Sequence, residues 1–216
     1  MSNVSTATEN PKLGEGIFFP RDVANILRLK YEKVYPLMNG FWQTRTFGND
    51  RNKAVNFYAL IEFYFYFHFR QNGMSSQKIK KFHQQLAKDL NTRYPFAHYE
   101  IRTDYKNIWA MESGNLVKAD GKKQYDCFHL LDSFLHRIVY GDNKLASKYY
   151  PLENNANVVV DPKRQFGQTI IEGTSIKTKT IYSLYLGGET DQRISNLYNI
   201  SIEKVRDAIS FHATAA

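Results

Sequence analysis

Apolar positions between residues 17 and 42 recur at the spacing of two short helices. The first helix can start at Pro20, because proline suits the first turn, and its apolar face comprises Val23, Ala24, Ile26 and Leu27. A break at Leu29–Lys30 precedes a second helix, which Asn39–Gly40 ends and whose apolar face comprises Val34, Leu37 and Met38. Two short helices joined by a tight turn predict a helix-turn-helix, with Pro36 expected near the first turn of the second helix.

The pattern then changes to a hairpin followed by two longer helices. Gly48–Asn49–Asp50 are turn residues, and they predict a β-hairpin, which is a wing when it directly follows a helix-turn-helix. Asn56 predicts the cap of a helix that runs to Gln71 and stops before Gly73. Ser75 opens a further helix, whose buried face comprises Ile79, Phe82, Leu86 and Leu90.

The middle of the chain has weaker patterns. Short runs separated by turns predict a small antiparallel meander, and these runs are Tyr99–Thr103, Asn107–Met111 and Leu116–Lys118. Apolar residues at helical spacing predict a helix from Asp126 to Val139. The polar, turn-rich stretch of residues 141–157 is the best candidate for a linker.

The last part of the chain starts with two short predicted strands, Val158–Val160 and Thr169–Ile171. Three helices follow: one from about Thr178 to Leu186, one starting at Thr190 and one capped by Ser201. The last two form a second helix-turn-helix-like pair.

These elements predict a mainly α fold with small β elements, in three parts behind a tail. Residues 1–16 are expected to form a disordered tail and residues 17–95 a winged helix-turn-helix domain. Residues 96–157 would hold the β-meander, a helix and the linker. Residues 158–216 would form a C-terminal three-helix, helix-turn-helix-like domain.

Charge is distributed unevenly over these parts. The net charge of the chain is +8, and residues 17–95 alone contain 13 basic and 5 acidic residues. Residues 158–216 contain 7 basic and 6 acidic residues and are close to neutral. A focused basic segment attracts polyanions, which favours nucleic acid as a partner of the first domain.

Several classes of protein do not fit the sequence. No apolar run reaches the roughly 18 residues that a membrane span needs, and the N-terminus does not resemble a signal peptide. Cys127 is the single cysteine, so an intramolecular disulfide and a cysteine zinc site are excluded. The expected location is the cytoplasm.

The sequence predicts no catalytic site and no cofactor. Glycine-rich phosphate loops and a serine nucleophile elbow are both missing from the sequence. His129, Asp132 and His136 offer a weak alternative, a metal-dependent hydrolase, although a polar helix face explains them more simply. A second alternative is a free-standing transcription regulator whose effector pocket is lined by aromatic residues of the run 57–69, which are more often core.

The first domain supplies the chemistry of DNA recognition. Residues near the start of the second helix of a helix-turn-helix meet base edges in the major groove, and here these are Lys30, Tyr31, Lys33 and Tyr35. Lysine can donate to guanine, and tyrosine can bond phosphate or pack on thymine methyl groups. The wing adds three basic residues for the phosphate backbone or the minor groove: Arg45, Arg51 and Lys53.

Two resemblances make the prediction more specific. The segment 158–211 resembles the DUF433 family through Asp161–Pro162, Gly167, Ile170–Ile171, Gly173–Thr174, Ile176, Thr178, Gly187–Gly188, Ile194, Tyr198, Val205 and Ala208–Ile209. Members of that family are frequently antitoxins paired with PIN-type ribonuclease toxins. The first half is similar in layout to winged helix-turn-helix domains of the MerR type, and the segment 94–109 resembles the larger VapB-class antitoxins.

The resemblance implies an antitoxin that binds operator DNA to regulate its own operon and neutralises a PIN-type ribonuclease toxin. We expect a homodimer, because a domain of fewer than about 70 residues buries little core and often gains stability by association. The expected interface residues are Ile181, Tyr182, Tyr185, Leu186 and Tyr198, with Leu197 beside them.

Overall fold

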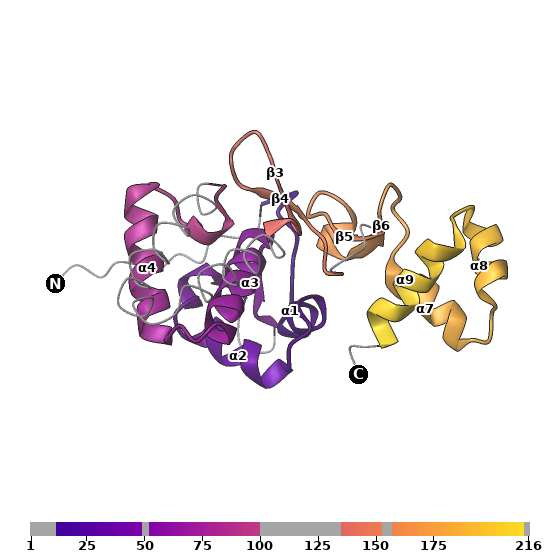
Figure 1. Cartoon of the computed structure of the whole chain (residues 1–216), viewed down its shortest axis with the longest axis horizontal. Coiled ribbons are helices and arrows are strands. Elements are labelled where there is room, and N and C mark those ends of the chain that lie inside the picture. The colour runs from indigo at the N-terminus through magenta and orange to yellow at the C-terminus, as the bar shows by residue number, and fades with distance from the viewer. Residues whose placement is uncertain (1–11, 49–51, 100–134, 153–156, 214–216) are drawn as a thin grey trace, which may run out of the picture.

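The structure is a computed structural model that describes residues 12–48, 52–99, 135–152 and 157–213 (Figure 1). The described chain is mixed helical, with two small antiparallel sheets. Its α-helices are α1 (Pro20–Leu27), α2 (Tyr31–Asn39), α3 (Phe57–Gln71), α4 (Ser76–Asp89), α7 (Thr178–Leu186), α8 (Asp191–Tyr198) and α9 (Ile202–Ala213). Short 3₁₀ turns are η1 (Gln43–Arg45), η3 (Pro95–Ala97) and η4 (Gln165–Gly167). Figure 1 shows strands β3 to β6 between the N-terminal and the C-terminal groups of helices.

Polar caps fix the starts of the helices where the sequence predicts them. The Asn56 side chain accepts a hydrogen bond from the Ala59 N–H at 3.0 Å, and Ser75 accepts one from the Lys78 N–H at 3.3 Å. Thr190 caps α8 in the same way, through the Arg193 N–H at 3.2 Å. Each such cap contributes about 1 kcal/mol by satisfying a backbone donor that the helix leaves open. The predicted starts of these three helices are therefore confirmed.

The pair α1–α2 is joined by three residues, 28–30. Arg28 ends α1 in the left-handed conformation, with φ 57° and ψ 45°, and its N–H bonds back to the carbonyls of Ala24 and Asn25. Pro36 is the sixth residue of α2, so the expectation that it lies near the first turn is wrong. Its ring has no N–H to donate to the carbonyl of Glu32, which removes one bond from a helix of only nine residues.

A short hairpin follows this pair. Strand β1 (Thr46–Phe47) pairs antiparallel with β2 (Ala54–Val55) in the register Thr46 to Val55. On its other side β2 meets the segment before α1, because Phe18 and Val55 exchange both backbone hydrogen bonds, at 2.9 and 3.0 Å. The base of the hairpin is therefore held between two neighbours.

The second sheet has the order β3-β4-β5-β6, with neighbouring strands antiparallel. Its strands are β3 (Ile138–Tyr140), β4 (Ala146–Tyr149), β5 (Val158–Val160) and β6 (Thr169–Ile171). The last two coincide with the predicted strands. The sheet corrects two other expectations: residues 138–139 belong to β3 and not to a helix, and the proposed linker 141–157 contains β4. Pairing with β5 and burial of Ala146 and Tyr149 outweigh the polar composition of that stretch. The predicted meander and most of the predicted helix 126–139 lie outside the described residues.

Two hydrophobic cores differ in chemistry. The larger one lies between α1, α2, α3, α4 and the first strands of the sheet and is rich in fully buried aromatic side chains, which include Trp42, Phe57, Phe63, Phe65, Phe69 and Phe96. The smaller one is aliphatic and consists of Ile171, Ile181, Ile194, Val205 and Ala208. Within the described part of the chain, no helix combines the length and the apolar character that crossing a bilayer requires.

Candidate nucleic-acid interface

Helix α2 has one buried and one exposed face. Val34 and Met38 are fully buried, whereas Lys30, Tyr31 and Lys33 are exposed. The rings of Tyr31 and Tyr35 stack with centroids 5.7 Å apart, so the half-buried Tyr35 supports its exposed neighbour. Four predicted DNA-binding residues thus occupy the start of α2, and three of them face solvent.

Of the three basic residues predicted for a wing, Arg45, Arg51 and Lys53, the two that the structure describes differ in their surroundings. Lys53 donates a hydrogen bond to the side-chain oxygen of Asn39, which ties the hairpin to the end of α2. The guanidinium of Arg45 turns inward, where its Nε and Nη2 donate to the Arg93 carbonyl at 2.9 and 2.7 Å. Its side chain is 11% exposed, so a phosphate contact would require breaking these bonds. Arg51 lies outside the described residues.

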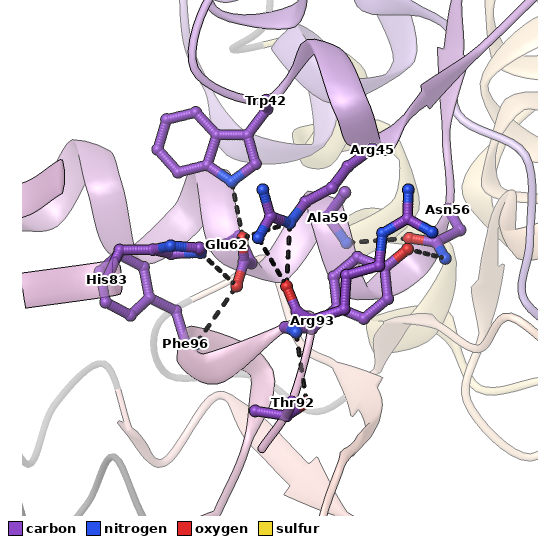
Figure 2. A network of polar contacts seen from close by, with 10 residues as sticks. Trp42, Arg45, Asn56, Ala59, Glu62, His83, Thr92, Arg93 and Phe96 are labelled. Atoms are coloured by element: carbon purple, nitrogen blue, oxygen red, sulfur yellow. Dashed lines mark hydrogen bonds and ion pairs between the residues drawn. The ribbon is translucent and has the colours of Figure 1, made fainter. Parts of the chain in front are cut away.

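A buried carboxylate organises the base of the β1–β2 hairpin, and we call it and the residues around it the Glu62 cluster: Trp42, Arg45, Glu62, His83 and Phe96 (Figure 2). One carboxylate oxygen of Glu62 lies 2.6 Å from the Trp42 indole nitrogen and 2.8 Å from His83 Nε2. The other oxygen accepts the Phe96 N–H at 3.3 Å. Arg45 Nε lies 3.5 Å from the carboxylate as an ion-pair partner.

Burial makes these contacts necessary. Glu62 is fully buried, and a buried charge costs on the order of several kcal/mol unless it is paired and hydrogen-bonded. Trp42 in turn packs edge-on against Phe63 at 5.2 Å and Tyr66 at 5.0 Å. The cluster joins η1, α3, α4 and η3, so it fixes the chain that enters the β1–β2 hairpin. The sequence gives a single signal for this role, one acidic residue within the apolar run 57–69, and it does not identify the partners.

The C-terminal pair α8–α9 has the same outline with a different surface. Arg206 on α9 pairs with Asp191 at 3.0 Å, and Arg193 pairs with Glu189 at 3.2 Å. Lys204, the third residue of α9, donates to the Glu172 carbonyl at 3.0 Å. These basic groups are engaged within the chain, in agreement with the neutral charge balance of this segment.

The predicted interface residues separate into core and surface. Ile181 is fully buried in the aliphatic core, so it cannot form part of an exposed interface. Tyr182 stacks on His212 at 5.1 Å and Tyr198 packs against the same core, and both are half-buried. Tyr185 and Leu186 at the end of α7 are 45% and 66% exposed, and Leu197 on α8 is 67% exposed. Of the residues predicted for the interface, these three are the exposed ones in the described chain.

The described residues give little support to the two alternatives, a free-standing transcription regulator with an effector pocket and a metal-dependent hydrolase. Most aromatic residues of the run 57–69 are core, although Tyr64 and Phe67 line a cleft of about 420 Å³ next to the turn between α1 and α2. His129 and Asp132 lie outside the described residues. The described part of the chain has no group of three or more side chains suited to holding a metal ion, and His136 is exposed there.

The described structure is that of a mixed helical protein. Residues 158–212 match the family described as Protein of unknown function (DUF433). The chain is 26% identical over 168 residues to the Mycobacterium tuberculosis protein named "Putative antitoxin VapB45", covering 71% of this chain and 69% of that protein. It is also similar to the crystal structure of Rv2018 from Mycobacterium tuberculosis, with a TM-score of 0.72. That likeness covers 89% of this chain and 96% of the other at 19% identity, and it supports the fold alone.

Proposed function

We propose that this protein is an antitoxin of a type II toxin-antitoxin system, which binds operator DNA through α2 and the wing and neutralises a PIN-type ribonuclease. The observation that carries the antitoxin role is the similarity to the mycobacterial protein named as an antitoxin, which extends over 168 residues and so beyond the DUF433 match. The role is regulatory and requires no catalytic site. Co-expression with a toxin encoded beside this gene, followed by pull-down and a growth-rescue assay, tests it. A toxic neighbour that is neither bound nor neutralised contradicts the antitoxin role.

Support for DNA binding comes from the exposed face of α2. Lys30, Tyr31 and Lys33 stand at the start of a helix whose opposite face is buried, which is the arrangement that a major-groove reader needs. Lys53 contributes a further basic group beside the end of α2. Arg51 belongs to the same proposal on sequence grounds, whereas the inward geometry of Arg45 removes it.

The binding test for this step is the salt dependence of affinity of the full chain for duplex operator DNA. The logarithm of the affinity should fall linearly with the logarithm of the salt concentration, with a slope of about −0.9 per phosphate neutralised. Affinity that does not change between low and physiological salt contradicts the electrostatic argument. A free-standing transcription regulator would pass this test and fail toxin capture, so the two experiments distinguish the alternatives.

We further propose a homodimer that is assembled through the exposed end of α7. Tyr185, Leu186 and Leu197 form the apolar surface available for it. A two-fold dimer would place two α2 helices on a palindromic operator. Sedimentation of the full chain at micromolar concentration measures the mass, and a monomer contradicts the dimer while leaving toxin docking open.

A further inference from the structure

A cleft lies at the joint between the N-terminal helices and the C-terminal segment. It has a volume of about 400 Å³, and α1 forms one wall while α7 and the end of α9 form the other. This volume is within the range of small-molecule sites, which is roughly 300–1,000 Å³.

The floor of the cleft is held closed by backbone contacts. Ile17 donates its N–H to the Phe166 carbonyl at 3.0 Å, which joins the segment before α1 to η4. Phe18 is buried between two glycines, and a Cβ on Gly167 would come within 2.3 Å of its ring. The two walls are therefore parts of one packed unit and not two surfaces that meet by chance.

Apolar and cationic groups line the cleft together. Phe18, Ile26 and Phe211 supply the apolar surface. Two lysines, Lys177 and Lys179, supply positive charge from the start of α7, and in the described chain neither has a carboxylate oxygen within the 4 Å of an ion pair. Polar donors are added by Asn25 of α1 and Gln168.

The one acidic residue of the lining already has a structural role. Asp22 accepts the Phe19 N–H at 2.9 Å, which caps the start of α1. Burial raises the pKa of Asp22, and the Phe19 N–H and the nearby charge of Lys179 oppose this rise, but in the described chain neither lysine of the cleft forms an ion pair. The cleft therefore carries two ammonium groups against one engaged carboxylate, a net charge of +1.

The positive charge of the cleft also affects the pKa of a neighbouring histidine. The pKa of His212, which lines the cleft, is lowered to about 4 by burial and then by the positive charges of Arg28 and Lys179. Its imidazole is neutral at physiological pH and pairs with the Thr178 hydroxyl at 3.0 Å. It therefore adds no charge of its own to the walls.

We propose that this cleft binds a small organic anion, a carboxylate on an aromatic or aliphatic body, with Lys177 and Lys179 as its charge partners. The apolar floor takes the body of the ligand, and the ammonium groups at the start of α7 take its carboxylate. The ligand contacts α1 and α7 at once, so it joins the N-terminal and C-terminal parts of the chain.

Three probes of equal size and different charge test the proposal on the full chain: 2-naphthoate, 2-naphthamide and 2-naphthylmethylamine. Calorimetry should give naphthoate an affinity about tenfold higher than either of the others, since each exposed ion pair adds a modest factor. Equal affinity of the three, or preference for the amine, overturns the proposal.

Variants locate the site. The double variant Lys177→Gln/Lys179→Gln should lose about tenfold in naphthoate affinity, whereas Lys163→Gln, an exposed lysine outside the cleft, should lose none. Ser183→Trp fills the cleft and should abolish binding, while Thr180→Trp on the same helix lies outside it and should not. Circular dichroism checks that each variant folds. Binding that survives both the double variant and Ser183→Trp overturns the assignment.

Discussion

The helix pairs α1–α2 and α8–α9 have the same outline and different surfaces. Each is joined by three residues, and each first helix ends in a left-handed residue, Arg28 with φ 57° and Asn199 with φ 51°. Position three of the second helix is lysine in both, yet Lys33 is exposed while Lys204 bonds to the Glu172 carbonyl. Burial pattern and turn therefore give the two pairs the same outline, whereas the two lysines differ in whether they are free to contact a partner.

The two regions also differ in how their cores are held. The N-terminal core encloses a carboxylate with its partners, while the C-terminal core is aliphatic. The polar cluster ties η1 and the β1–β2 hairpin to the aromatic core. Four predictions test this contrast, beginning with the largest effect.

Removal of the Glu62 carboxylate should unfold the N-terminal region most easily. Glu62→Ala leaves the Trp42 and His83 nitrogens without their acceptor and Arg45 without its ion-pair partner, and we expect a loss of about 3–5 kcal/mol in the free energy of unfolding. Urea unfolding followed by tryptophan fluorescence measures it. Asp89→Ala, which removes an exposed contact to Gln85, is the control and should change stability by less than about 0.5 kcal/mol. Equal losses in the two variants contradict the role of the cluster.

A charge at the end of α7 should break the proposed dimer. Leu186→Glu removes an apolar contact and introduces a charge, and we expect a weaker association by about 3 kcal/mol. Analytical ultracentrifugation should then show half the mass at micromolar concentration. Leu13→Glu alters a leucine that is 97% exposed near the start of the described chain and should leave the mass unchanged. A dimer that tolerates Leu186→Glu must use another surface.

Replacing the two equivalent lysines by alanine should affect DNA affinity differently in the two helix pairs. Lys33→Ala should weaken operator binding by about 1–3 kcal/mol and relax specificity at one base pair. Lys204→Ala should leave DNA affinity unchanged, because its ammonium is engaged with Glu172. Arg51→Ala should weaken all DNA sequences alike, as expected of a phosphate contact. Fluorescence anisotropy with operator and scrambled duplexes measures all three, and equal effects at Lys33 and Lys204 would mean that α2 is not the reading helix.

Acid should destabilise both regions through one histidine in each. Burial, with the nearby charge of Arg137, lowers the pKa of His68 on α3 to about 4, and His212 on α9 is lowered to the same value. The unfolded chain binds these protons near pH 6.5, so the stabilisation is complete above that pH and is lost as the pH falls toward 4. The effect is the smallest of the four, because both side chains are partly exposed. Urea midpoints between pH 7 and 4.5 should decline less in His68→Gln and in His212→Gln than in the wild type, and parallel curves contradict the prediction.

The sequence predicts those features whose signals are local. Helix starts are predicted at Asn56, Ser75 and Thr190, because a cap side chain bonds to the backbone only three positions away. Strands β5 and β6 are recognisable because both are apolar runs bounded by turn residues. Each of these signals lies within one element and needs no knowledge of the rest of the fold.

The features that the sequence does not predict depend on distant partners. The partners of Glu62 lie 17 to 34 positions away along the chain, so neither the cluster nor the inward turn of Arg45 has a local signature. Strand β4 is polar in composition and becomes a strand because β3 and β5 flank it. Ile181 follows the same rule: its burial depends on how α7 packs against α9, which periodicity alone cannot distinguish from an exposed apolar stripe.

The contact of Phe18 with Gly167 has a consequence for synthesis on the ribosome. Phe18 is translated about 150 residues before the glycine that closes over its ring. At the elongation rates of about 5–20 residues per second, the gap lasts several seconds or longer. During that time α1 and β2 lack their cover on this side. A nascent chain can therefore begin to build its aromatic core before this contact forms, but it completes the joint between Phe18 and Gly167 only after Gly167 has been translated.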